Sequence, residues 1–169
     1  MFKRRLNPVI FLDKRKFKVQ EEKNKTIYLS KEIKIKDFKK IIISWNIVTP
    51  VDSYVDIEAR VLVNNNLKEK IWSKWLSWGR WGTNIKRASN SSNCTEAKIN
   101  VDTLTINEGY IGEAIQIKIS SYYDDKESKA DLQLVVITYC GEKINNKNGK
   151  EKLINKLIET PCISQMKRE

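Results

Sequence analysis

Residues 55–63 read VDIEARVLV, a stretch in which apolar and polar side chains alternate almost without a break. Successive side chains of an extended strand point to opposite faces of a sheet. The odd-numbered positions of this stretch therefore form one apolar face, whereas Asp56, Glu58 and Arg60 point to the other face. This pattern predicts a half-buried β-strand with one face on a core and one face in water.

The same period of two recurs on both sides of this strand. It appears, broken by polar turns such as Asn64-Asn65-Asn66, in residues 26–29, 33–35, 41–48, 97–106 and 115–119. Residues 132–139 are apolar nearly throughout, which predicts a central strand covered on both faces. The phase slips by one residue at Asp102-Thr103, which predicts a β-bulge or a bend within residues 97–106. About eight short strands and no helical period before residue 150 predict an all-β fold. We expect an antiparallel β-sandwich, jelly-roll-like, with a short C-terminal tail.

The chain has 169 residues, which is enough for one core of ordinary size. We expect four segments along it. A basic N-terminal segment, either an edge strand or a docking tail, occupies 1–25, and the β-sandwich domain occupies 26–140. A linker rich in Lys and Asn follows at 141–152, and a tail with a few apolar residues occupies 153–169.

The composition excludes several kinds of catalysis. The chain contains no histidine, so it lacks the usual general base for a Ser or Cys nucleophile and the commonest ligand of transition metals. Its three cysteines, Cys94, Cys140 and Cys162, are widely spaced and form no C-x-x-C pair, which argues against a disulfide framework and a zinc site. We therefore expect no enzyme activity, no metal and no cofactor.

The chain is strongly basic, with a net charge of +11, but its charge pattern argues against nucleic-acid binding. Only seven of the 32 basic residues are arginine, and the lysines are scattered. A phosphate-binding surface more often concentrates arginine, whereas scattered lysine keeps a surface hydrated. No apolar run is long enough to span a membrane, and no export signal is recognisable at the N-terminus. A cytoplasmic location is the default expectation, with a secreted or cell-surface location as the alternative.

Four of the five tryptophans stand at an unbroken spacing of three in one segment, at Trp72, Trp75, Trp78 and Trp81. In one continuous strand, Trp72 and Trp78 would point to one face and the other two to the opposite face. Exposed indoles, with the Arg80 guanidinium beside them, would form an aromatic platform for a glycan, a peptide or a partner domain. The alternative is that all four pack in the core, because tryptophan is highly buried on average.

Several blocks of the sequence together resemble a known family. They are WSKW at 72–75, SWGRW at 77–81, DTL at 102–104, AIQIKI at 114–119, LQLVVI at 132–137 and TPCISQM at 160–166. In this order they resemble the non-catalytic N-terminal domain of clostridial bacteriocin-processing (double-glycine) peptidase-like proteins, which are papain-type cysteine peptidases. The last block is similar to the opening of the peptidase domain in that family.

The resemblance implies an accessory domain, since the catalytic Cys and His of such peptidases follow the part of the family that this chain resembles. Cys162 lies within the opening stretch and is not expected to be the nucleophile. The leading hypothesis is a non-catalytic accessory or recognition domain that packs on a peptidase domain or presents substrate. The alternative is a stand-alone module that binds cell-wall glycans through exposed tryptophans. The expected partners are accordingly a peptidase domain or a polypeptide or glycan ligand.

Overall fold

The structure, a computed structural model, describes residues 9–65, 67, 69–86 and 90–141. Twelve β-strands and one short 3-10 helix occupy these residues. They are β1 (Val9–Asp13), η1 (Lys14–Lys16), β2 (Phe17–Glu22), β3 (Lys25–Ser30), β4 (Ile33–Val48), β5 (Ser53–Asn65), β6 (Lys70–Trp72), β7 (Leu76–Trp81), β8 (Ser91–Asn93), β9 (Ala97–Asn100), β10 (Thr103–Ile106), β11 (Tyr110–Tyr123) and β12 (Asp131–Gly141). No helix within the described part is long and apolar enough to cross a membrane.

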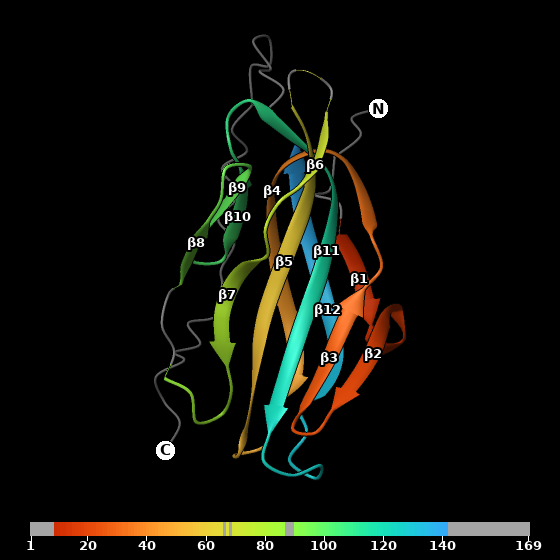
Figure 1. Ribbon diagram of the computed structural model, residues 1–169, viewed down its shortest axis with the longest axis vertical. Helices are drawn as coiled ribbons and strands as arrows, with labels where there is room; N and C mark the ends of the chain where they lie inside the picture. The colour runs from red at the N-terminus through yellow and green to blue at the C-terminus, as the bar shows by residue number, and fades with distance from the viewer. Residues whose placement is uncertain (1–8, 66, 68, 87–89, 142–169) are drawn as a thin grey trace, which may run out of the picture.

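The strands pack as two antiparallel layers (Figure 1). In the front layer the strands lie in the order β2-β3-β11-β5, and both β6 and β7 pair with the far edge of β5. In the back layer the order is β1-β12-β4-β10-β9-β8. This arrangement confirms the predicted antiparallel β-sandwich. The strand count exceeds the predicted eight because short strands such as β6 and β8 have only three residues, too few for a visible period.

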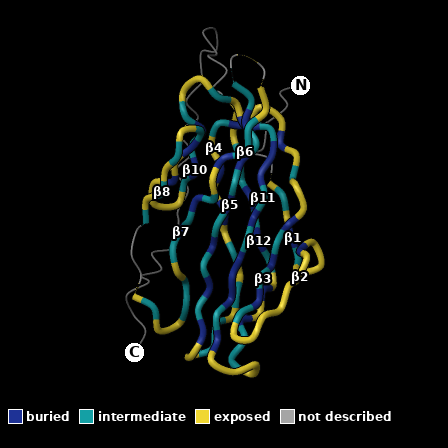
Figure 2. The backbone as a smooth tube through the Cα atoms, in the orientation of Figure 1, coloured by how far each residue is buried: buried dark blue, intermediate teal, exposed yellow. Residues whose placement is uncertain are grey.

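The core lies between the layers, and the pair of β5 and β11 contributes most of its front wall. The two strands pair along almost their whole length, from Tyr110 opposite Asn65 to Tyr123 opposite Ser53. The odd-numbered side chains of β5 from Val55 to Val63 are buried, while the even-numbered ones are partly exposed (Figure 2). The alternation in residues 55–63 therefore predicted the buried face correctly.

Strand β4 belongs to both layers and joins them. Its first residues pair with β11 in the front layer, and residues from Phe38 onward pair with β12 in the back layer. Asp37 has a φ of 54° at this crossing point, and the Phe38 ring is fully buried against Gly112 of β11. The sixteen-residue strand thus merges the two shorter strands predicted at 33–35 and 41–48.

Residues 9–22 of the predicted N-terminal segment form edge strands, one of the two alternatives expected for it. β1 lies at the edge of the back layer, β2 lies at the edge of the front layer, and η1 connects them. The linker predicted at 141–152 begins at the last residue of β12, and its remaining residues, 142–152, lie outside the described residues. So do the tail predicted at 153–169 and Cys162 within it.

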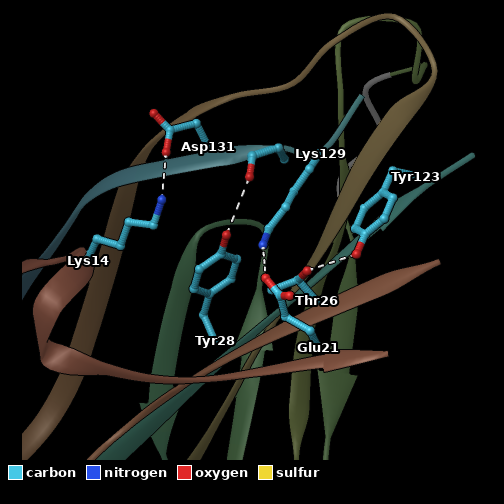
Figure 3. Close-up of polar contacts among 8 residues, drawn as sticks. Lys14, Glu21, Thr26, Tyr28, Tyr123, Lys129 and Asp131 are labelled. Atoms are coloured by element: carbon cyan, nitrogen blue, oxygen red, sulfur yellow. Dashed lines mark hydrogen bonds and ion pairs between the residues drawn. The ribbon is translucent and has the colours of Figure 1, made fainter. Parts of the chain in front are cut away.

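Polar contacts close the sandwich beside β2 and β3 (Figure 3). Three of them join the front layer or η1 to β12 or to the loop before it, and the fourth joins β3 to the end of β11. The contacts are Lys14 to Asp131 (3.1 Å), Lys129 to Glu21 (2.6 Å), the Tyr28 hydroxyl to the Ala130 carbonyl (3.5 Å) and Thr26 to the Tyr123 hydroxyl (3.1 Å). Burial raises the pKa of Tyr28.

The phase slip at Asp102-Thr103 is a chain reversal and not the predicted bulge or bend. β9 and β10 form a hairpin in which Asn100 pairs with Thr103, so that Val101 and Asp102 are the turn residues. Two-residue hairpin turns require a positive φ, a conformation suited to glycine. Val101 adopts a φ of 58° although it is β-branched, and this residue type conceals the turn in the sequence.

We expect Val101→Gly to raise the free energy of unfolding by about 1 kcal/mol. Relief of the left-handed strain on a β-branched residue outweighs the added entropy of glycine in the unfolded chain. Thermal denaturation measures this effect. Val51 is similarly exposed but has no positive φ, so Val51→Gly is the matched control and should lower stability slightly. Equal losses in both variants would contradict a strained turn at Val101.

Candidate functional site

The four spaced tryptophans lie in two separate groups. Trp72 ends β6, residues 73–75 lie outside strands, and β7 begins at Leu76. Trp72 and Trp75 both meet the Arg60 guanidinium, whose carbon lies 4.7 Å and 5.0 Å from the centres of the two rings. Both tryptophans are therefore on the outer, polar face of the front layer, where Arg60 projects.

Trp78 belongs to the core side of β7. It is buried, and its indole Nε1 donates to the Asp102 carbonyl oxygen at 3.0 Å. The pairing of β7 with β5 shifts here, because Gly79 is opposite Ile57 while Ser77 is opposite Glu58. Trp78 is the extra residue of this bulge.

The predicted division of the tryptophans between faces is therefore wrong. It assumed one continuous strand from Trp72 to Trp81. The break at residues 73–75 and the bulge at Trp78 each change which face the next side chain occupies, because strand alternation depends on unbroken pairing.

The outer face of the front layer carries a network of paired charges, which we call the charged face. It comprises Asp56, Glu58 and Arg60 of β5, Arg80 of β7 and Lys118 of β11. Lys118 Nζ lies 2.7 Å from Glu58 Oε2 and 4.6 Å from the Trp75 ring centre, and Arg60 Nε donates to Gln116 Oε1 at 2.9 Å. The cations at the two indoles are thus engaged within the domain, and aromatic faces covered by them are less open to a ligand.

Arg80, predicted as part of the aromatic platform, lies on this same face away from Trp78. Its Nε lies 3.4 Å from Asp56 Oδ1, and its guanidinium lies 4.7 Å from the centre of the Tyr54 ring. Partial burial raises the pKa of Asp56, the Glu58 carboxylate adds to that increase, and Arg80 opposes it. The structure does not gather Arg80 and the four tryptophans into one platform.

Trp81, the last residue of β7, lines a pocket together with residues at the end of β4. The pocket has a volume of about 420 Å³ and is also lined by Ile47, Val48 and Ile85. The Trp81 ring packs edge-on against Trp45 of β4, with ring centres 6.1 Å apart. Trp81, one of the predicted site residues, thus lies in a concave surface of mixed character, in which Thr49 and Thr83 stand beside the apolar residues.

An open strand edge lies beside this pocket. β4 pairs with β12 as far as Val48, but on its other edge β10 reaches only Lys40 to Ile42. Among the described strands, none pairs with that edge between Ile43 and Val48. Unpaired backbone groups of this kind can accept an added strand from an extended peptide.

Cys94 does not have the surroundings that activate a cysteine nucleophile. Cys94 is half-buried, its Sγ lies 3.3 Å from the Ala97 carbonyl oxygen, and burial raises the pKa of its thiol. A raised thiol pKa disfavours the thiolate that acts as a nucleophile. Within the described part of the chain, no three or more Cys, Asp or Glu side chains cluster in a way that would hold a metal ion.

The main contacts that sequence reasoning missed are those of Arg60 and Lys118 with the tryptophans. The alternation of β5 and β11 places both cations on the polar face. Their meeting with Trp72 and Trp75 depends on the pairing of Gln116 with Arg60 and of Leu62 with Trp72, which the sequence does not reveal.

Comparison with known families gives one finding. Residues 17–138, from β2 into β12, match the family described as the Peptidase C39 N-terminal domain. This match confirms the resemblance to the N-terminal domain of such peptidases, while the clostridial subgroup stays a prediction. Comparisons with curated proteins and with solved structures give no match. With most of the sandwich inside the matched range, the chain belongs to the family of Peptidase C39 N-terminal domains.

Proposed function

We propose that this chain is a non-catalytic accessory domain of a C39-type peptidase and that it acts by packing on a peptidase domain. The observation that carries the proposal is the family match over residues 17–138, since the family is described as the N-terminal domain of a peptidase. Peptide-bond hydrolysis would then be the task of the peptidase domain.

The composition of the chain supports a non-catalytic role for it. A papain-type reaction needs a thiolate activated by a histidine, and the chain contains no histidine. The described thiol with a resolved pKa change, that of Cys94, has its pKa raised, opposite to what a nucleophile needs.

A second role, presentation of substrate, is favoured by the Trp81 pocket and the open edge of β4. An extended peptide could add a strand along Ile43–Val48 and place one side chain in the pocket. The predicted glycan module would also have to use this pocket, because Trp78 is buried and cations lie over Trp72 and Trp75.

The proposal is tested by adding the purified chain to the C39 peptidase domain encoded nearest to it in its genome. We expect the chain alone to hydrolyse no peptide, and to raise the melting temperature of the peptidase domain by several degrees through mass action. Packing alone should leave KM unchanged. Presentation of substrate should instead lower KM, and Trp81→Ala should abolish that decrease.

Two outcomes would refute the accessory function. One is turnover by the chain alone that Cys162→Ala abolishes, because it would make the chain an enzyme. The other is a peptidase domain whose melting temperature, kcat and KM are all unaffected by a saturating excess of the chain.

A further inference from the structure

The outer face of the back layer differs from that of the front layer because its described side chains carry no charge over the central area. Its outward side chains come from four neighbouring strands, β1, β12, β4 and β10, and we call this surface the neutral face. Its members are Val9, Phe11, Ile42, Ser44, Thr103, Leu134, Val136 and Thr138.

The register places these side chains side by side. Val9 is opposite Thr138, which is opposite Ile42, which is opposite Thr103, so one uncharged row crosses all four strands. In the next row Phe11 is opposite Val136, which is opposite Ser44. Phe11 is 64% exposed and Ile42 is 42% exposed, although both are large apolar residues.

The charged face on the front layer differs from the neutral face in its polar contacts. There the cations pair with carboxylates and aromatic rings of the same domain, so these charged groups already have partners within the domain. The neutral face has no such partners to satisfy and is surrounded by charge, with Lys40 and Lys98 at one end and Asp13 and Asp131 at the other. An uncharged centre with a charged rim is the anatomy of a protein interface.

The size of the neutral face indicates what kind of partner it fits. Strands about 4.8 Å apart and about 3.3 Å of rise per residue give a flat area of about 320 Å² for four strands of five residues. Stable complexes between free proteins bury about 800 Å² on each partner, whereas interfaces between domains of one chain begin at about 600 Å² in total. The neutral face is small for a free dimer and adequate for a tethered domain, whose effective concentration is high.

The path of the chain also favours a tethered domain as the partner of the neutral face. β12, the last described strand, lies in the middle of the neutral face, and the chain leaves it at Gly141 at the end of the same layer. A domain that follows the N-terminal domain in sequence therefore comes after the strand that lies in the middle of the neutral face.

We infer that the neutral face is the surface on which the peptidase domain packs, with Phe11 and Ile42 as its central apolar contacts. The inference rests on the proposed function. It adds which surface of this domain is used, that the contact is apolar, and what kind of surface the peptidase domain presents to it. The matching surface on the peptidase domain is apolar and uncharged at its centre, because a buried unpaired charge opposite Phe11 or Ile42 would weaken the contact.

The test measures the Kd of the complete chain for the nearest-encoded C39 peptidase domain. Ile42→Lys and Phe11→Ser should each raise that Kd at least tenfold. Val19→Lys is the matched control, since Val19 is an aliphatic strand residue 43% exposed on β2, away from the neutral face, and it should leave the Kd unchanged. The melting temperature of each variant alone should stay within a few degrees of the wild type, because the replaced side chains are exposed.

The possible results distinguish a failure of the inference from a failure of the proposed function. If the wild type does not bind the peptidase domain at concentrations up to about millimolar, the effective concentration of a short tether, the proposed function fails, and the inference fails with it. If the wild type binds and all three variants bind equally well, the proposed function stands and the neutral face is the wrong surface. If the wild type is a dimer that Ile42→Lys dissociates, the neutral face belongs to a second copy and the inference is overturned.

Discussion

Replacement of Gly112 by alanine is expected to lower the free energy of unfolding by about 3 kcal/mol, the upper part of the range for overpacking a core. A Cβ at this position would lie 2.5 Å from Phe38 Cε1, closer than non-bonded carbon atoms approach. Phe38 is fully buried where β4 passes from the front layer to the back layer. The ring therefore cannot move aside without disturbing the joint between the layers.

Urea denaturation of Gly112→Ala measures this loss. The matched control is the double variant with Phe38→Leu, because a smaller side chain at Phe38 makes room for the new methyl group. We expect Phe38→Leu to cost less in the Gly112→Ala background than in the wild type, with a coupling energy of about 1 to 2 kcal/mol. A loss below about 0.5 kcal/mol for Gly112→Ala alone would contradict the packing described for this joint.

Trp78→Ala should lower the free energy of unfolding by about 3 to 5 kcal/mol, as expected for truncation of a buried tryptophan. Trp78 belongs to the core, and its indole nitrogen bonds to the Asp102 carbonyl in the turn between β9 and β10. It therefore ties β7 of the front layer to the back layer.

Trp75→Ala is the control for this prediction. Trp75 is only half-buried on the charged face, so its removal should cost about 1 to 2 kcal/mol, the value of two partly exposed cation–π contacts, with Arg60 and Lys118. Trp78→Phe should fall between the two, since it keeps an aromatic ring but removes the hydrogen bond to Asp102. Equal small losses for Trp78→Ala and Trp75→Ala would contradict the buried position of Trp78.

The fold class could be predicted from the sequence because alternation is a local property. Residues 55–63 identify their own buried face, and the run at 115–119 does the same for part of β11. The apolar run at 132–139 predicted a strand covered on both faces, which is wrong for the described part of the chain, because Leu134, Val136 and Thr138 on the outer face of β12 are partly exposed. The β9–β10 hairpin could not be recognised, since its turn uses Val101 where glycine or asparagine is the usual signal.

The surfaces were harder to predict because they depend on which strands are neighbours. The spacing of the tryptophans predicted an aromatic platform, but a break and a bulge separate Trp72 and Trp75 from Trp78 and Trp81. The neutral face could not be predicted from the sequence either. Ile42 and Ser44 alternate outward in β4, yet their meeting with Thr138 and Val136 follows only from the register of β12.

The most direct test of the accessory function is calorimetric titration of the chain into the C39 peptidase domain encoded nearest to it, at several temperatures. Packing through an apolar face predicts saturable binding with a negative heat-capacity change, the robust mark of apolar surface buried on association. Absence of binding at every temperature would contradict the accessory function. Binding whose heat-capacity change is zero would contradict an apolar contact surface.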